Sequence, residues 1–291
     1  MFSDYIYGST AHSEYYACKV TGASHLRSEM TCQDAYEVVC LADDEKVTFL
    51  AVADGHGSEK HDLSEHGSRL AAKAAVQIMQ ELHHKFGTMP RELTRSFKQD
   101  FPRLVVRRWQ RFVKEDAVSR SIPVPEDLDG IRALYSRYGT TLLAAMCMPQ
   151  AVLLGQIGDG NIVFIDSEGR VEVPFAETSD ELIGNATYSM SSEQAHLLWS
   201  TAQRTVDAKP TLFLMSTDGL ANSFESDPSY QAFARSLLEN IRAKSVHAYR
   251  DYFPEMLSDF TSRGSGDDIT IAIHYYGEPE IDTSHGVEEG E

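Results

Sequence analysis

The sequence predicts an antiparallel α+β fold built in layers, and three observations carry this prediction. Short runs of β-branched and aliphatic residues, separated by turn residues, recur along the chain and are typical of strands. Long segments with a helical spacing of apolar residues fall between groups of these runs. The regular strand–helix–strand alternation that builds a parallel sheet is rare. We therefore expect antiparallel sheets covered by helices rather than a doubly wound parallel sheet.

The predicted strands are short, apolar segments bounded by turn residues: 38–41, 47–53, 140–146, 151–157, 162–165, 171–173, 211–216 and 269–276. The predicted helices are longer segments with one apolar face: about 60–84, 97–113, 192–202 and 230–259. In the first of these helices the apolar face runs from Ala71 to Leu82, and in the second it includes Trp109.

The 291 residues include 44 Asp and Glu against 26 Lys and Arg, which gives a formal net charge of −18. Such a chain repels nucleic acids and anionic membranes, so neither is expected as a partner. The first residues lack a basic, apolar leader, and no run approaches the roughly 18 apolar residues of a membrane span. The four cysteines show no metal-like pairing and are expected to be reduced thiols, with a structural disulfide as the alternative. These features predict a soluble, cytoplasmic protein, which we expect to be a monomer.

No internal repeat and no interior linker divides the chain, so residues 1–276 are predicted to form one domain. Residues 277–291 hold six acidic residues, no basic ones and little to bury, and are predicted to be a disordered tail. Residues 85–120 depart from the acidic composition, with ten Lys or Arg against four Asp or Glu. This basic region is either the solvated face of a helix or a docking surface for an acidic regulatory partner or for the chain's own tail.

Three predicted strands end in Asp-Gly, at Asp54-Gly55, Asp159-Gly160 and Asp218-Gly219. Asp-Gly is also a favoured hairpin turn, but the first pair leads into a predicted helix and the third does not lead back into an alternating pattern. A further acidic pair, Asp267-Asp268, opens the last strand. Carboxylates at strand ends suit Mg²⁺ or Mn²⁺, because these hard cations prefer oxygen ligands. The pattern therefore indicates a divalent metal site.

Taken together, six motifs resemble in order and spacing those of the metal-dependent serine/threonine protein phosphatases of the PP2C (PPM) type. They are Gln33-Asp34-Ala35, Asp54-Gly55-His56-Gly57, Gly139-Thr140-Thr141, Gly158-Asp159-Gly160-Asn161, Ser216-Thr217-Asp218-Gly219 and Gly266-Asp267-Asp268-Ile269-Thr270. The resemblance spans roughly residues 20 to 276. It implies a four-layer α-β-β-α sandwich, in which two antiparallel sheets are flanked by helices.

The resemblance also implies a set of metal ligands. Asp54 would bridge two ions of Mn²⁺ or Mg²⁺, and the carbonyl of Gly55 would bind one of them. Asp218 and Asp267 would complete the protein ligands of the other ion. Asp159 would help to hold a third, weaker ion near the entrance. Two such ions lower the pKa of a shared water and clamp the phosphoryl oxygens.

The remaining roles implied by the resemblance concern the chemistry beside the ions. Asp34 would orient metal-bound water, and His56 would be the general acid, since a histidine with a pKa near 6.5 can protonate the leaving alkoxide. Two residues depart from the family pattern. Gln33 stands where the family commonly has a glutamate that helps to hold the second metal. Glu29 stands where a phosphate-binding arginine is usual, so that Arg27 is the nearest candidate for phosphate contact, its alternative being an ordinary surface arginine.

The resulting prediction is an enzyme that hydrolyses phosphoserine and phosphothreonine in phosphorylated proteins, by attack of a metal-bridging hydroxide. Two alternatives belong to other classes. One is a catalytically weak domain of the same fold that acts as a regulatory or phosphoprotein-binding module, motivated by Gln33 and the displaced arginine. The other is a metal-dependent nuclease or nucleotide phosphatase, which the negative charge of the chain disfavours.

Overall fold

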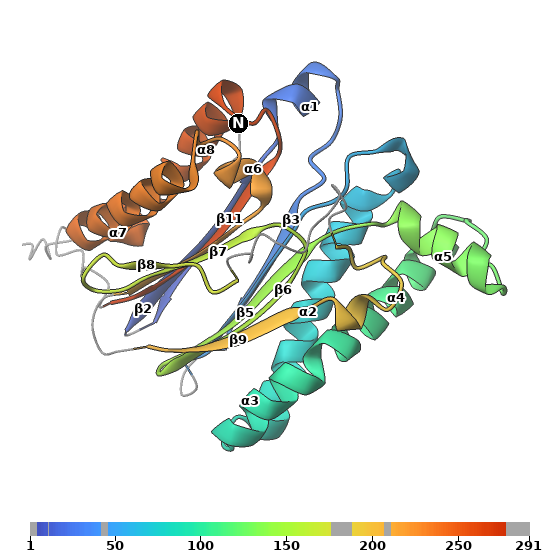
Figure 1. Cartoon of the computed structure of the whole chain (residues 1–291), viewed down its shortest axis with the longest axis horizontal. Coiled ribbons are helices and arrows are strands. Elements are labelled where there is room, and N and C mark those ends of the chain that lie inside the picture. Colours follow the sequence, from blue (N-terminus) through green and yellow to red (C-terminus); the bar gives the residue numbers. More distant parts are fainter. Residues whose placement is uncertain (1–4, 11, 42–45, 176–187, 207–210, 278–291) are drawn as a thin grey trace, which may run out of the picture.

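The fold is a pair of antiparallel β-sheets between two groups of helices, as a computed structural model of the chain shows (Figure 1). The structure describes residues 5–10, 12–41, 46–175, 188–206 and 211–277. One sheet has the strand order β1-β2-β11-β10-β7-β8 and the other has the order β3-β4-β5-β6-β9. The strands are β1 (Tyr5–Thr10), β2 (Ser13–Val20), β3 (Ala35–Cys40), β4 (Thr48–Ala53), β5 (Leu142–Met148), β6 (Ala151–Ile157), β7 (Asn161–Ile165), β8 (Val171–Glu172), β9 (Ser200–Thr205), β10 (Thr211–Ser216) and β11 (Ile269–Tyr276).

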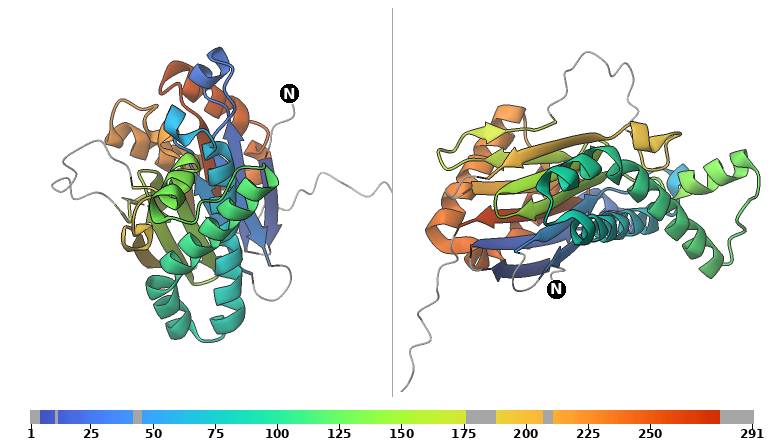
Figure 2. Two further views of the ribbon diagram at one scale, coloured as in Figure 1. Left: turned by 90° about the vertical axis from the view of Figure 1, so that its right-hand side faces the viewer. Right: turned by 90° about the horizontal axis from the view of Figure 1, so that it is seen from below.

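The helices form the two outer layers. Along the chain they are α1 (Ala23–Arg27), α2 (Ser64–Phe86), α3 (Pro90–Gln99), α4 (Phe101–Ser119), α5 (Leu128–Arg137), α6 (Asp218–Ala221), α7 (Asp227–Tyr249) and α8 (Phe253–Arg263), with single 3-10 turns η1 (Glu59–His61) and η2 (Ala195–Leu197). Helix α2 packs on β3, β4 and β5, and α4 packs on α2, whereas α7 and α8 cover the other sheet. Figures 1 and 2 place α5 and α7 at opposite ends of the molecule. The predicted four-layer α-β-β-α sandwich is confirmed.

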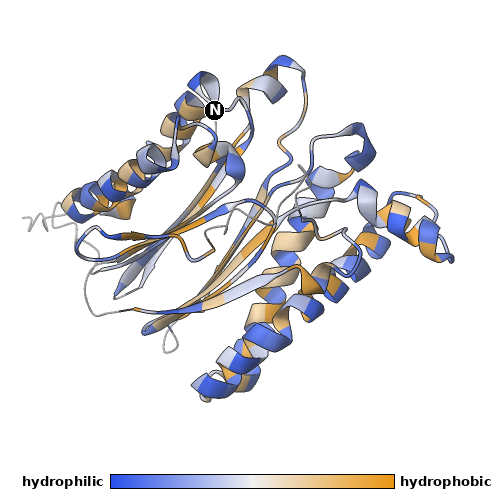
Figure 3. Ribbon diagram, in the orientation of Figure 1, coloured by the Kyte–Doolittle hydropathy of each residue, from blue (hydrophilic) through white to orange (hydrophobic). Residues whose placement is uncertain are grey.

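The apolar residues divide into three layers that follow from the periodicity of each element. In β11, Ile269, Ile271 and Ile273 pack against the helices α7 and α8, whereas Ala272 and Tyr276 face the opposite sheet. Successive strand residues point to opposite faces, so one strand supplies two core layers. The predicted stripe of α2 from Ala71 to Leu82 is buried against the second sheet. Figure 3 shows apolar residues on the strands and on the inner turns of α2, with hydrophilic residues outside.

Most strand predictions are confirmed, three of them with the same bounds as β6, β10 and β11. Strands β1, β2 and β9 were not predicted, because polar residues interrupt their apolar pattern. In β2 the carboxylate of Glu14 is fully buried, and it accepts hydrogen bonds from the Tyr7 hydroxyl at 2.8 Å and from the backbone N–H of Val246 at 3.1 Å. Val246 lies 232 residues away in sequence, so the strand pattern alone could not reveal why a glutamate is tolerated there.

The helix predicted over 97–113 is wrong in its bounds, since two helices meet at Asp100. Helix α3 ends at Gln99 and α4 begins at Phe101, with Pro102 in its first turn. Proline lacks a backbone N–H and is tolerated in the first turn of a helix but not in its interior. The basic residues of the 85–120 region lie mostly on the exposed sides of α3 and α4. Both interpretations of that surface stay predictions.

The helix predicted over 192–202 is also wrong. That segment forms only the turn η2, and Ser200–Thr205 is strand β9, which pairs with β6 along its whole length. The helical spacing of its apolar residues does not reflect a helix. Strand β9 lies at the edge of the sheet and is rich in polar residues, and β6 supplies the hydrogen-bond partners along one side of its backbone. The segment predicted as helical over 230–259 contains two helices, α7 and α8, because Pro254 starts a new first turn.

The sequence predicts that the domain ends at residue 276 and that a disordered tail follows over residues 277–291. Strand β11 ends at Tyr276, and residues 278–291 of the predicted tail lie outside the described residues. Within the described ranges, no helix is long and apolar enough to cross a membrane. All four cysteines lie in those ranges, and none forms a disulfide.

His274 is a buried histidine on β11 that is not among the predicted site residues. It is 2% exposed, and neither ring nitrogen has a hydrogen-bond partner among the described residues. Burial lowers the pKa of His274 from its ordinary 6.5 to about 3, because the charged ring would lose its hydration. The folded protein therefore keeps this histidine neutral at a pH where the unfolded chain already binds a proton.

We expect His274→Leu to flatten the pH dependence of stability between about pH 6.5 and 3. In this interval the unfolded state binds the proton and the folded state does not, so the wild-type free energy of unfolding falls as the pH drops, at up to about 1.4 kcal/mol per pH unit. Urea denaturation at several pH values checks this, with the exposed His84→Leu as the control. Parallel pH profiles for wild type and His274→Leu would contradict it.

Candidate metal and phosphate site

The candidate site residues meet because of the antiparallel order of the strands. The ends of β4, β6 and β10 lie at the same end of the sandwich as the starts of β3, β5, β7 and β11, since neighbouring strands run in opposite directions. Asp54 follows β4, Asp159 follows β6, and Asp218 follows β10. Asp34 precedes β3, and Asp267 precedes β11. All five aspartates therefore lie at one end of the molecule, and they come from both sheets.

The Gly139-Thr140-Thr141 motif holds the backbone of Asp54. The carbonyl of Asp54 accepts hydrogen bonds from the backbone N–H of Thr141 and from the Thr140 hydroxyl, each at 2.8 Å. Its own N–H donates to the Thr141 hydroxyl at 3.2 Å. The next two residues are held at the same place, because Gly55 pairs with Thr140 and the N–H of His56 donates to the carbonyl of Gly139 at 3.1 Å. This motif thus fixes the Asp54-Gly55-His56 segment.

Thr217 links Asp34 to the last strand. The Thr217 hydroxyl donates to Oδ2 of Asp34 at 2.8 Å and accepts the backbone N–H of Thr270 at 2.9 Å. Asp34 is 1% exposed, and its other oxygen, Oδ1, is buried without a hydrogen-bond partner among the described residues. The Thr217 hydroxyl therefore ties Asp34, just before β3, to the start of α6 and to β11.

The turn that carries Asp159 requires a glycine. Gly158 has a φ of +103°, a backbone conformation that side chains with a Cβ rarely adopt. The Gln156 amide donates to the carbonyls of Gly158 and Gly160 at 3.0 and 2.9 Å, which fixes the turn from the side of β6. Asp159 therefore sits at the tip of a braced connection between the two sheets.

A cavity of about 630 Å³ opens at this end of the sandwich. The predicted site residues that line it are Asp54, His56, Asp159, Asp218 and Asp267. Its other lining residues come from the segment before α2 that includes η1, from the end of α5, from the residue before β5 and from the segment before η2: Gly57, Ser58, Lys60, His61, Ser136, Thr141, Ser189, Ser191 and Ser192. Four carboxylates and two histidines therefore share a single cavity.

The carboxylates repel one another across this cavity. Burial raises the pKa of Asp54 well above its usual range, and the charges of Asp34 and Asp218 add to this effect. Burial also raises the pKa of Asp34, with Asp268 as the next cause, and raises the pKa of Asp218, with Asp159 next. Each group resists ionisation because it is desolvated and close to others of the same charge. A divalent cation would reverse this effect, since it favours the ionised form of every carboxylate near it.

The donor set fits a hard divalent cation. The cavity lining supplies the carboxylate oxygens of Asp54, Asp159, Asp218 and Asp267. Gln33 is not among the lining residues, and its Oε1 is buried without a hydrogen-bond partner in the described part of the chain. Mg²⁺ and Mn²⁺ prefer such ligands and keep several waters. Over the described residues, no three His, Cys, Asp or Glu side chains already form a ready-made metal site. The chemistry of the ligands fits the ion, and their side chains have to converge on it.

His56 lies at the wall of the cavity beside a second histidine. The ring centroids of His56 and His61 are 4.8 Å apart, and Nδ1 of His61 is hydrogen-bonded to the Ser136 carbonyl. Burial lowers the pKa of His56 to about 4, with the charges of His61 and Lys60 adding to the effect and Asp159 opposing it. A bound phosphate dianion would raise this pKa, because a neighbouring negative charge favours the protonated ring.

The two candidate cationic contacts for phosphate, Arg27 and Lys60, differ in their position relative to the cavity. Arg27 is exposed at the end of α1 and is not among the described residues that line the cavity. Lys60, which was not predicted from the sequence, is the only lysine or arginine among the described residues that do line it. The one signal that could have identified Lys60 and His61 was their position three and four residues after the Asp54-Gly55-His56-Gly57 motif.

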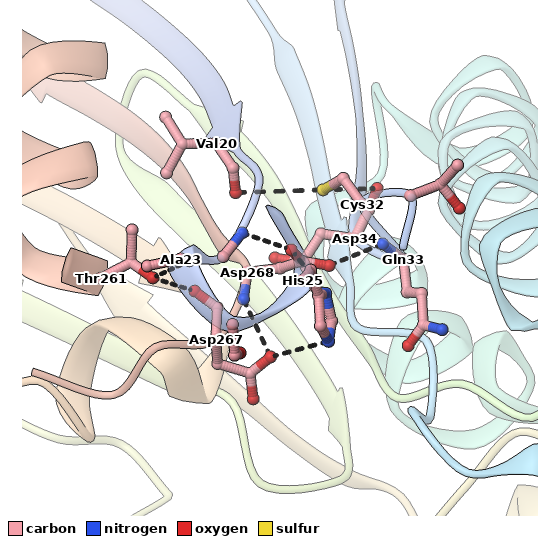
Figure 4. Close-up of polar contacts among 12 residues, drawn as sticks. Val20, Ala23, His25, Cys32, Gln33, Asp34, Thr261, Asp267 and Asp268 are labelled. Atoms are coloured by element: carbon pink, nitrogen blue, oxygen red, sulfur yellow. Dashed lines mark hydrogen bonds and ion pairs between the residues drawn. The ribbon is translucent and has the colours of Figure 1, made fainter. Parts of the chain in front are cut away.

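Asp267 and Asp268 differ in their surroundings although they are neighbours. The side chain of Asp267 is 51% exposed, whereas that of Asp268 is 3% exposed and accepts two backbone N–H groups (Figure 4). His25 on α1 lies against both carboxylates. The sequence marked Asp267 as a ligand but gave no indication of a role for His25, because their contact joins residues more than 200 positions apart.

Comparison with known proteins agrees with this arrangement. The family model described as protein phosphatase 2C matches residues 21–258, which is most of the chain and includes the sites from Asp34 to Asp218. Asp267 lies beyond the matched segment. Serine/threonine-protein phosphatase 3 of Escherichia coli strain K12 is 25% identical over 266 residues, which cover 88% of this chain and 96% of that protein.

Solved structures show the same fold at low identity. The catalytic domain of the serine threonine protein phosphatase PstP, solved in complex with two manganese ions, has a TM-score of 0.53 at 18% identity and covers 91% of this chain and 98% of that one. RsbX in complex with magnesium has a TM-score of 0.51 at 15% identity, with 93% and 98% covered. A bacterial serine phosphatase has a TM-score of 0.57 at 14% identity, with 93% and 100% covered.

Proposed function

The chain belongs to the protein phosphatase 2C family of serine/threonine-protein phosphatases, and on this premise we propose that it hydrolyses phosphoserine and phosphothreonine in protein substrates. The observation that carries the proposal is the convergence of four carboxylates and His56 on one cavity, from elements of both sheets. A protein that only binds phosphate has no use for this many neighbouring like charges, because each makes the ionisation of the others less favourable. The set is explained if the charges serve a cation.

We propose Mn²⁺ or Mg²⁺ as the cofactor, with two ions held at this cavity. Asp54 would hold both ions, with the Gly55 carbonyl and Gln33 on one side and Asp218 and Asp267 on the other. Asp159 would hold a third, weaker ion. When bound, such cations would activate water as the nucleophile and would neutralise charge on the phosphoryl oxygens. Gln33 brings an oxygen but no charge, so ion binding on its side depends more strongly on Asp54.

The chain's own side chains supply the rest of the chemistry. Asp34 would orient water by accepting a hydrogen bond, and the Thr217 hydroxyl, which donates to its Oδ2 at 2.8 Å, supports this role by fixing the carboxylate. His56 donates a proton to the leaving serine or threonine oxygen, which is a poor leaving group without one. Lys60 at the cavity wall and Arg27 on α1 are the proposed cationic contacts of the substrate, the first to the phosphate and the second from the rim.

The function is tested by phosphate release from a phosphothreonine peptide in the presence of Mn²⁺, with and without a chelator. We expect turnover with Mn²⁺ that the chelator abolishes and that added Mn²⁺ restores. The melting temperature should rise with Mn²⁺ concentration, because an ion that binds only the folded state stabilises it by mass action.

Two results would count against this function. Mn²⁺ that raises the melting temperature without any turnover would favour the catalytically weak regulatory or phosphoprotein-binding module. The absence of both turnover and a thermal shift at saturating Mn²⁺ would contradict the proposal that this cavity binds a metal ion.

A further inference from the structure

The buried side chain of Asp268 connects its own loop to two other segments of the chain. Its Oδ1 accepts the backbone N–H of Gly22, and its Oδ2 accepts that of Gln33, each at 2.7 Å. The side chain is 3% exposed, and a carboxylate buried to this extent needs such partners to offset its lost hydration. The two bonds tie the loop before α1 and the Gln33-Asp34 segment to the residue that follows Asp267.

The imidazole of His25 spans the two neighbouring carboxylates. Its Nδ1 lies 2.9 Å from Oδ1 of Asp268, at ion-pair distance though not in line for a hydrogen bond, and its Nε2 lies 3.9 Å from Oδ1 of Asp267. The His25 side chain is 15% exposed, so the ring is held in the gap rather than lying on the surface. Figure 4 shows the ring between the two aspartates.

The backbone around His25 is fastened to the same loop. The N–H of Ser24 donates to the Gly266 carbonyl at 2.8 Å, and the N–H of Ala23 donates to the Thr261 hydroxyl at 2.9 Å. That hydroxyl donates in turn to the Asp267 carbonyl at 2.7 Å. At Gly22 a Cβ would lie 2.4 Å from the carbonyl carbon of Asp267, so the two segments touch at backbone distance. The backbone that carries His25 is therefore held against the Asp267 loop by the contacts of residues 22–24.

Asp267 is the candidate ligand that most needs such support. Its side chain is half exposed, and its Oδ1 accepts a hydrogen bond from the backbone N–H of the next residue, Asp268, at 2.9 Å. A mobile carboxylate loses conformational freedom when it binds a cation, and a neighbour that already restricts it raises the affinity. Partners of this kind behind a metal ligand typically contribute about 10- to 100-fold in metal affinity.

We infer that His25 is a positioning residue that orients the carboxylate of Asp267 for the cation, with Asp268 fixing the imidazole from behind. The inference rests on the proposed function, because it requires Asp267 to bind an ion. It assigns His25 no contact with the substrate or with the reacting atoms. Its effect should therefore appear in the affinity for the metal and not in turnover at saturating metal.

The test compares His25→Asn, His25→Ala and the exposed control His84→Asn on α2. In asparagine the amide nitrogen takes the place of Nδ1, so contact with Asp268 can persist while the reach toward Asp267 is lost. The dissociation constant of Mn²⁺ is measured by calorimetry on the metal-free proteins, together with their urea denaturation and with kcat at saturating Mn²⁺. We expect both His25 variants to bind Mn²⁺ about 10- to 100-fold more weakly, with kcat little changed and the control unaffected.

Each other outcome overturns the inference. If His25→Asn binds Mn²⁺ as tightly as wild type, His25 only braces α1 against Asp268. If kcat falls at saturating Mn²⁺ without a change in the dissociation constant, His25 acts on the reaction and not on the metal ligand. If wild type itself neither binds Mn²⁺ nor releases phosphate, the proposed function fails first, and the inference fails with it. Should His25→Ala not fold, His25→Asn alone decides between these outcomes.

Discussion

Replacing Asp54 by asparagine is expected to lower phosphatase activity by more than about 100-fold, because a residue that binds the ions directly matters more than the neighbours that orient such ligands. Asp54 comes from β4, shares its cavity with Asp218 and Asp267, and is the proposed ligand common to both ions. Asparagine keeps the shape but removes the charge and one acceptor oxygen. Initial rates on a phosphothreonine peptide at saturating Mn²⁺ measure the effect.

The same substitution should stabilise the metal-free protein. Burial and the charges of Asp34 and Asp218 raise the pKa of Asp54, so its ionised form is unfavourable in the folded state near neutral pH. Removing that charge should raise the melting temperature without metal by about 2 °C or more. Asp259→Asn, an exposed change on α8, serves as the control. A loss of activity accompanied by a lower melting temperature would instead point to a folding defect.

Replacing His56 by alanine should reduce turnover of a phosphothreonine peptide by about 100- to 10,000-fold, while an aryl phosphate should lose far less. A serine or threonine alkoxide needs a proton to leave, whereas a phenolate leaves without much help. The ring is placed for this role at the cavity wall, with its backbone N–H fixed on the Gly139 carbonyl at 3.1 Å. Steady-state rates on both substrates give the comparison.

The exposed variant His84→Ala is the control for His56→Ala and should affect neither substrate. Equal losses on the peptide and on the aryl phosphate would exclude His56 as the general acid. They would suggest instead that it shapes the cavity, for example through its contact with His61 at 4.8 Å between ring centroids.

The layered fold could be predicted because its information is local. Strands such as β6, β10 and β11 are continuous apolar runs, and their ends are marked by Asp-Gly or Asp-Asp. The helix breaks at Pro102 and Pro254 were also local signals, but the strands that were missed depend on distant partners. Strand β9 is held by β6 rather than by its own composition, and the buried Glu14 of β2 is satisfied by backbone groups of α7. A single sequence does not show these pairings.

Some residues of the candidate site could likewise be predicted from the sequence, and others could not. Its five aspartates and His56 stand at strand ends, where sequence position fixes spatial position once the strands are antiparallel. Lys60 and His25 could not be chosen in advance, because the cavity wall and the Asp267-Asp268 loop are formed by segments from distant parts of the chain. Arg27 was selected by its nearness in sequence to the usual arginine position, and the structure puts it outside the cavity lining, so its contact with phosphate stays a prediction.

The origin of the carboxylates in both sheets has a mechanical consequence. Asp54 belongs to the sheet covered by α2, whereas Asp218 and Asp267 belong to the sheet covered by α7 and α8. A cation held between them would join the two halves of the sandwich as a non-covalent cross-link at one end. Shear between the halves would pull its ligands apart, so the grip on the ion depends on the apolar layer between the sheets, where Leu50 and Phe213 pack. Packing between the two sheets would thereby affect the affinity for the cation at the end of the sandwich.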